Sequence, residues 1–140
     1  METVAENQEV GTVKKLEKMF GHIDFRNPPE LCPVRDVMSV ASDQWSILII
    51  LWLAYFPVLR FNKLKKYVYG ISNKVLSQRL KVLEADGYIS RTAYPEVPIR
   101  VEYSLTEFGQ SYVEKLLELT EWMQANSPKV LANREKYGLF

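Results

Sequence analysis

The sequence predicts a mainly α-helical protein with a small β-hairpin, an α+β architecture. Three observations carry this prediction. Two short helical patterns, both basic, lie on either side of Gly70. Residues 88–105 follow as a proline-containing hairpin whose second strand alternates apolar and polar side chains. Longer helical patterns flank this block on both sides. This order is typical of a winged helix-turn-helix, with further helices expected on its N- and C-terminal sides.

Composition limits the classes of function. A length of 140 residues with 47% hydrophobic content fits one domain with a real core. One cysteine and one histidine exclude a disulfide framework and a Cys/His metal cluster within one chain. No P-loop, Ser/His/Asp set or paired-carboxylate motif is present in the sequence. We therefore expect no enzyme activity and no cofactor or metal.

Charge is strongly segregated along the chain. The net charge is only +1, yet every charged side chain between Arg60 and Leu83 is basic. Acidic residues gather instead in a C-terminal stretch: Glu107, Glu114, Glu118 and Glu121. Separated blocks of opposite sign favour a protein with one DNA-facing side. The alternative is that the basic residues only solvate a helix surface.

The chain divides into three parts. Residues 1–30 are an extension that we expect to be helical in part, from the spacing of Val13, Leu16, Met19 and Phe20, or else a partly disordered tail. Residues 31–126 form the winged domain, and residues 127–140 a tail. The N-terminus lacks the apolar core of a secretory signal, and the apolar run 47–56 is too short to span a bilayer. A cytoplasmic protein without membrane contact is expected.

Local signals set the helices of the winged domain. Pro33 suits a first helical position, and Ser42-Asp43 offers a side-chain cap to the next helix. That helix, over residues 44–55, is apolar nearly all round and is therefore expected at the centre of the core. Thr106 caps the last long helix, which Ser127-Pro128 is expected to end.

The helix predicted over residues 73–86 has two distinct faces. Leu76, Leu80 and Leu83 form an apolar stripe, and a polar, basic stripe lies opposite. Glutamine and serine can read base edges, whereas lysine reaches guanine or phosphate. Arg79 lies at the boundary, where it supports a backbone contact or packs its stem. The predicted DNA-binding residues are Lys63, Lys66, Ser72, Asn73, Lys74, Ser77, Gln78, Lys81, Arg91 and Arg100.

Two features of this prediction leave alternatives open. On the hairpin, Arg91 and Arg100 are placed to reach phosphate or the minor groove, with Arg100 at the tip favoured; an ordinary hairpin edge is the alternative. The last helix carries more apolar surface than a small domain needs, which predicts a homodimer or packing on the chain's own first helix. The predicted dimer interface comprises Leu16, Phe20, Phe108, Tyr112, Leu116, Leu119 and Met123.

Several strings resemble the HxlR-type family of bacterial and archaeal transcriptional regulators. They are Cys32-Pro33-Val34, Trp45, Arg60-Phe61-Asn62-Lys63-Leu64, Gly70-Ile71-Ser72, Leu83-Glu84-Ala85-Asp86-Gly87 and the hairpin string from Tyr94 to Thr106. The resemblance runs from about Leu31 to about Gln124. It implies a prokaryotic homodimer that binds operator DNA as a repressor or activator. In that family the N- and C-terminal helices form the dimer, and several members sense electrophiles, quinones or oxidants through a cysteine matching Cys32.

The chain departs from the family pattern in two places. Where the family usually has two glycines and a lysine before Trp45, this chain has Ser42-Asp43-Gln44, so a basic side chain is missing. The extension before Cys32 is also longer than usual. Its role stays open.

Cys32 has two possible roles. Its position before Pro33, near Arg35, favours the thiolate and therefore a sensor of a small-molecule effector or oxidant. Alternatively it is a buried small hydrophobe. The function that competes with DNA binding for the whole chain is a winged-helix adaptor that binds proteins without specific DNA binding.

Overall fold

The computed structural model describes residues 4–20 and 33–139, and the chain divides into two units, residues 1–37 and 38–140. Helix α1, Val4–Phe20, belongs to the first unit and carries half-exposed Val13, Leu16 and Met19. The expected helix before Gly21 is therefore present. Helix α2, Pro33–Ala41, begins at the proline that its sequence favours and crosses the boundary of the units.

Helix α3, Gln44–Tyr55, is the central element of the second unit. Asp43 caps it, accepting a hydrogen bond of 3.1 Å from the Ser46 amide. Ile49 and Ile50 are fully buried, and α3 packs against α5, α6 and β2. These contacts confirm the core position expected from its apolar sequence. Among the described residues, no single helix is long and apolar enough to cross a membrane. Helices α2 and α3 meet both requirements only when they are taken together, and a bend of 63° separates them.

Helices α4, Phe61–Tyr67, and α5, Asn73–Ala85, form a helix-turn-helix. Gly70 adopts a φ of 85° in the turn, a left-handed conformation that glycine tolerates best. Ser72 caps α5 by accepting from the Val75 amide at 3.1 Å. The apolar stripe predicted for α5 is buried, at Leu76, Leu80 and Leu83.

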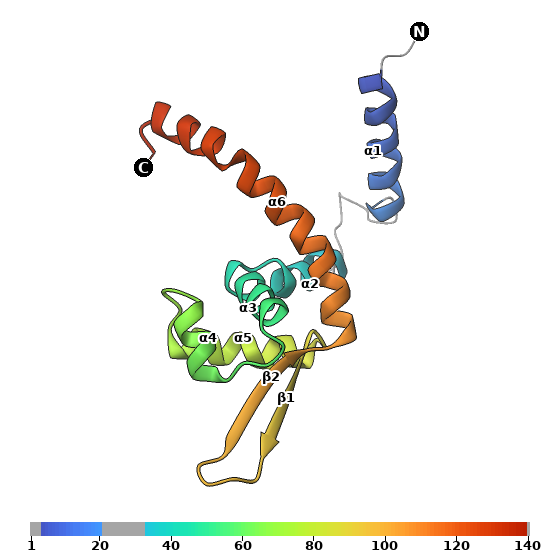
Figure 1. Cartoon of the computed structure of the whole chain (residues 1–140). Coiled ribbons are helices and arrows are strands. Elements are labelled where there is room, and N and C mark those ends of the chain that lie inside the picture. Colours follow the sequence, from blue (N-terminus) through green and yellow to red (C-terminus); the bar gives the residue numbers. More distant parts are fainter. Residues whose placement is uncertain (1–3, 21–32, 140) are drawn as a thin grey trace. The chain divides into compact units, whose positions relative to one another are not determined.

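Strands β1, Ile89–Tyr94, and β2, Arg100–Leu105, pair in antiparallel register from Ile89 opposite Leu105 to Tyr94 opposite Arg100. Figure 1 shows this hairpin projecting away from the helices of its unit as a wing. Leu59 adds an isolated bridge to Tyr103 through two backbone hydrogen bonds of 3.0 and 2.8 Å. The segment before α4 is thereby tied to the base of the wing.

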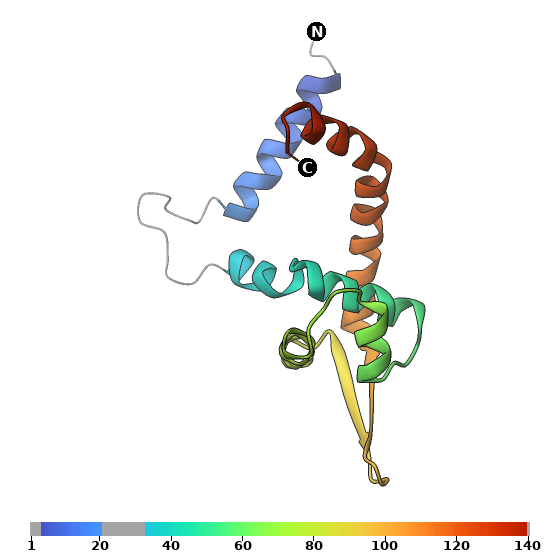
Figure 2. The same ribbon diagram turned by 90° about the vertical axis from the view of Figure 1, so that its left-hand side faces the viewer.

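Helix α6, Glu107–Lys136, begins at the predicted cap Thr106 but does not end at Ser127-Pro128 as expected. Proline removes one backbone donor, which leaves the Gln124 carbonyl without its usual partner. The Ser127 hydroxyl donates to that carbonyl at 3.1 Å and supplies the missing hydrogen bond. The helix therefore passes through Pro128, with the bend visible in Figure 2, and most of the predicted tail is helical.

Candidate nucleic-acid interface

The outward face of α5 carries the residues predicted to contact DNA. Burial of the leucine stripe turns the opposite stripe to solvent, and its members Asn73, Lys74, Ser77, Gln78 and Lys81 are all exposed. Lys63 and Lys66 on α4 are exposed as well. Ser72 is exposed too, and its hydroxyl oxygen accepts the hydrogen bond that caps α5. Ser72 therefore lies at the N-terminal end of this face.

A polar pocket of about 360 Å³ lies between α4, α5 and the wing. It brings together Ser77 and Lys81 of α5 with Arg91 of β1, three residues that the sequence predicts separately. The two cations and the hydroxyl provide donors for a DNA phosphate, and the Glu84 carboxylate lowers the net positive charge of the pocket. The remaining lining residues, Phe61, Glu84 and Tyr103, were not predicted, because they meet only in the fold.

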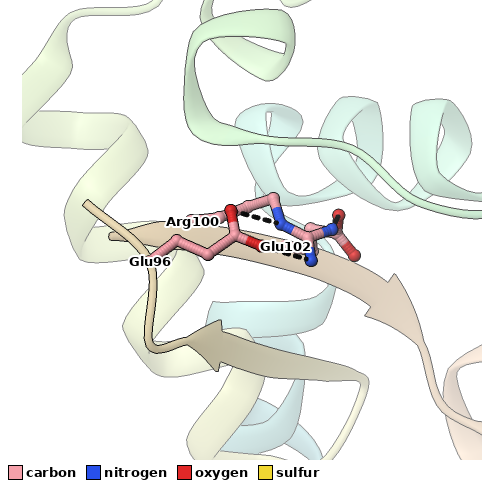
Figure 3. Close-up of polar contacts among 3 residues, drawn as sticks. All are labelled: Glu96, Arg100 and Glu102. Atoms are coloured by element: carbon pink, nitrogen blue, oxygen red, sulfur yellow. Dashed lines mark hydrogen bonds and ion pairs between the residues drawn. The ribbon is translucent and has the colours of Figure 1, made fainter. Parts of the chain in front are cut away.

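Arg100 lies in a closed network on the wing (Figure 3). Its Nε and Nη2 atoms donate to the two carboxylate oxygens of Glu96 at 3.2 and 3.0 Å, and Nη1 donates to Glu102 at 2.6 Å. The guanidinium also lies 3.7 Å from the centre of the Tyr94 ring. The hydrogen bond to Glu96 is the main reason that the pKa of Arg100 is raised.

This network revises the ranking of the two wing arginines. Sequence reasoning favours Arg100 because it lies near the tip. In the structure two carboxylates neutralise its charge, whereas Arg91 is exposed and lines the pocket beside α5. Arg91 is consequently the better placed of the two for a phosphate contact.

Arg79 is the basic residue of α5 that the fold directs away from the outward face. Its Nε lies 2.9 Å from Oδ2 of Asp43, the residue that caps α3. The sequence places Arg79 at the boundary of the two stripes, supporting a backbone contact or packing its stem. An ion pair to the start of another helix was not foreseen, because no local signal links residues 36 positions apart.

The predicted dimer residues fall into distinct environments. Tyr112 is half-buried and donates to the Ala41 carbonyl at 2.6 Å, and Leu116 is 2% exposed in the protomer's own core. Both face inward, contrary to the expectation, because α6 packs on α3 at this point. Phe108, Leu119 and Met123 stay exposed, as does Leu16 on α1. The predictions for Cys32 and the Phe20 side chain lie outside the described residues.

The second half of α6 presents an apolar groove of about 390 Å³. Its lining residues are Trp122, Met123, Asn126, Ser127, Val130, Leu131 and Arg134. Trp122 and Leu131 are 62% and 57% exposed. Three of the lining residues lie beyond Pro128. The groove was not predicted from the sequence, because the helix was expected to end at Ser127-Pro128.

A helix-turn-helix with an exposed polar and basic second helix, flanked by a β-hairpin, defines a winged helix-turn-helix DNA-binding protein. The model of the HxlR-like helix-turn-helix family matches residues 40–130. The chain belongs to this family of transcriptional regulators, which are not enzymes.

Similar proteins agree with this assignment. The chain is 42% identical over 107 residues to the uncharacterized HTH-type transcriptional regulator YtfH of Escherichia coli strain K12, covering 76% of this chain and 84% of that protein. Among solved structures, ytfH of Salmonella typhimurium matches with a TM-score of 0.70 at 41% identity, over 76% of this chain and 95% of the other. The redox regulator HypR in its reduced form matches with a TM-score of 0.66 at 32% identity, over 72% and 99%.

Proposed function

We propose that the protein regulates transcription by binding an inverted-repeat operator as a homodimer. The observation that carries this proposal is the face of α5, where Lys74, Ser77, Gln78 and Lys81 are exposed together. Uncharged Ser77 and Gln78 are flanked by lysines. This arrangement suits base reading at the centre and phosphate binding at the edges.

The homodimer rests on the apolar surface that the second unit leaves uncovered. Trp122, Met123 and Leu131 are more than half exposed on one helix. Large exposed apolar patches on soluble proteins mark interaction sites, and a second copy is the simplest partner. Two-fold symmetry then requires two half-sites, with recognition helices about 34 Å apart or a multiple of that distance.

Selection of genomic fragments by the purified protein, followed by footprinting, tests the proposal. A protected inverted repeat with half-sites about one helical turn apart is expected. Protection of a single asymmetric half-site contradicts the homodimeric operator. Binding without sequence preference, or weak retention on heparin with a flat salt response, supports the protein-interaction adaptor instead.

We also propose that Cys32 responds to electrophiles or oxidants. The similar protein HypR is described as a redox regulator, and the similar YodB of Bacillus subtilis was studied after diamide treatment. Cys32 is the only cysteine of the chain, so its products are an adduct, a mixed disulfide with a small thiol or a disulfide between protomers. Diamide should release wild-type protein from its operator and leave a Cys32→Ser variant bound. Equal release of both proteins contradicts the proposal.

A further inference from the structure

The turn between α2 and α3 holds an acidic side chain that contacts two other residues. Asp43 Oδ2 accepts hydrogen bonds from the Ser46 amide at 3.1 Å and the Ser46 hydroxyl at 3.4 Å, and it lies 2.9 Å from Arg79 Nε. The Asp43 side chain is only 20% exposed. Limited access to water strengthens the attraction between the two charges compared with an exposed pair.

Arg79 depends on this contact more than an exposed arginine would. Its Nε is buried and, among the described residues, makes no well-directed hydrogen bond, so the nearby Asp43 carboxylate compensates its charge. The lysines of the same helix, Lys74 and Lys81, are exposed to solvent on the outward face. One positive charge of α5 is thus paired with a carboxylate at the edge of the core, on a side chain that is 35% exposed, while two others face outward.

The same turn is also fixed from the side of α6. The Tyr112 hydroxyl donates to the Ala41 carbonyl at 2.6 Å. The turn therefore receives one polar contact from α6, the helix with the apolar groove, and another from the inner side of α5, through Arg79.

We propose that Asp43 is a positioning residue for DNA recognition, acting through Arg79. It fixes α5 against the start of α3 and keeps the Arg79 charge away from the DNA backbone. The proposal rests on the proposed operator binding and concerns its specificity. Phosphate contacts raise affinity for every sequence, whereas a fixed α5 favours the operator over other DNA.

Neutralising Asp43 should have two separable effects. The released Arg79 can reach a phosphate, which raises the affinity for scrambled DNA and steepens the salt dependence by about 0.9 for each additional phosphate that is bound. Looser attachment of α5 weakens base reading. Together these effects should lower the operator-to-scrambled affinity ratio about tenfold, within the range of coupling between residues in contact.

Asp43→Asn is the informative variant because asparagine caps helices as well as aspartate does, so the negative charge is removed while an oxygen that can cap α3 is kept. Glu118→Gln is the matched control, with the same charge change at an exposed position on α6. Wild type, both variants, Arg79→Gln and the double variant Asp43→Asn/Arg79→Gln are compared on operator and scrambled duplexes at several salt concentrations by fluorescence anisotropy. Thermal unfolding of each protein accompanies the binding measurements.

The expected result is a lower affinity ratio and a steeper salt slope for Asp43→Asn, neither of which appears in Glu118→Gln. In the Arg79→Gln background the Asp43 change should have no further effect on the ratio or the slope. An unchanged ratio and slope in a folded Asp43→Asn protein would overturn the proposal, as would equal effects in both Arg79 backgrounds. If Asp43→Asn does not fold, Arg79→Gln alone decides: a ratio equal to that of wild type overturns the proposal. Failure of wild-type protein to discriminate operator from scrambled DNA rejects the proposed function instead.

Discussion

Arg100 and Glu102 lie two residues apart on β2 and are joined by a hydrogen bond of 2.6 Å between Nη1 and Oε1. Alternate residues of a strand project from the same face, so the pair is favoured by the strand itself. Glu96 closes the network from the loop between the strands. The Arg100 guanidinium, the positive charge nearest the wing tip, is therefore already paired with two carboxylates in the absence of DNA.

Replacing each wing arginine by methionine should separate their roles. Arg91→Met removes an exposed charge beside Ser77 and Lys81, so the slope of log affinity against log salt should become shallower by about 0.9 for each phosphate that is no longer neutralised. Arg100→Met should leave that slope unchanged and lower the melting temperature, because it breaks hydrogen bonds within the wing. Anisotropy titrations and thermal unfolding measure both quantities. An equal reduction of the slope in the two variants would show that Arg100 leaves its carboxylates and binds phosphate.

Gly109→Ala should destabilise the domain. A Cβ at this position would collide with the backbone carbonyl oxygen of Tyr88, which cannot move without disturbing the start of β1. Overpacking of this kind costs about 1–3 kcal/mol. Gly11→Ala in α1 is the control, because no atom of the residues that the structure describes lies within 4 Å of its added carbon. Alanine also stabilises a helix interior by about 1 kcal/mol relative to glycine. Denaturant unfolding measures both changes, and a neutral Gly109→Ala would contradict the close approach.

Leu131→Glu should dissociate the proposed dimer. The change introduces a charge into the apolar groove of α6, where burial against a partner would carry a high desolvation cost. Light scattering at micromolar concentration should give about twice the chain mass of 16.3 kDa for wild type and the single chain mass for the variant. Lys129→Glu, an exposed change outside the groove, should stay dimeric. A wild-type protein that scatters as a monomer contradicts the dimer altogether.

Binding to DNA should depend strongly on salt. Lys63, Lys66, Lys74, Lys81 and Arg91 are exposed in each protomer, and a dimer doubles them. With about six to ten phosphate contacts, affinity should fall roughly 10³–10⁵-fold between 50 and 200 mM salt. Titrations across this range measure the slope. A nearly flat response would favour a role in protein binding.

The sequence predicted those features of the fold that local signals determine. A cap was expected at Ser42-Asp43 and at Thr106, and both Asp43 and Thr106 accept a hydrogen bond from the amide three residues later. The end of α6 was mispredicted at Pro128. There the Ser127 hydroxyl replaces the hydrogen-bond donor that proline lacks. A prediction that treats proline as a helix end does not take such a side-chain donor into account.

The candidate site was predictable in outline but not in its internal pairing. Helical periodicity identifies the outward face of α5, because the leucine stripe must turn inward. It does not identify which partner an apolar or charged side chain meets. Leu116 therefore proved to be buried in its own protomer, and Arg79 and Arg100 to be held by carboxylates that only the tertiary structure brings near.

The proposed operator binding requires that the exposed face of α5 reads bases, and we expect Lys66 on α4 to contact the DNA backbone instead. Gln78→Ala and Lys66→Ala test it when both are titrated with operator and scrambled duplex at two salt concentrations. Gln78→Ala should cost about 1–3 kcal/mol on the operator and little on scrambled DNA. Lys66→Ala should weaken both duplexes similarly and make the salt slope shallower by about one unit for each phosphate that it no longer binds. An operator-to-scrambled ratio that Gln78→Ala leaves unchanged would contradict the assignment of this face to DNA.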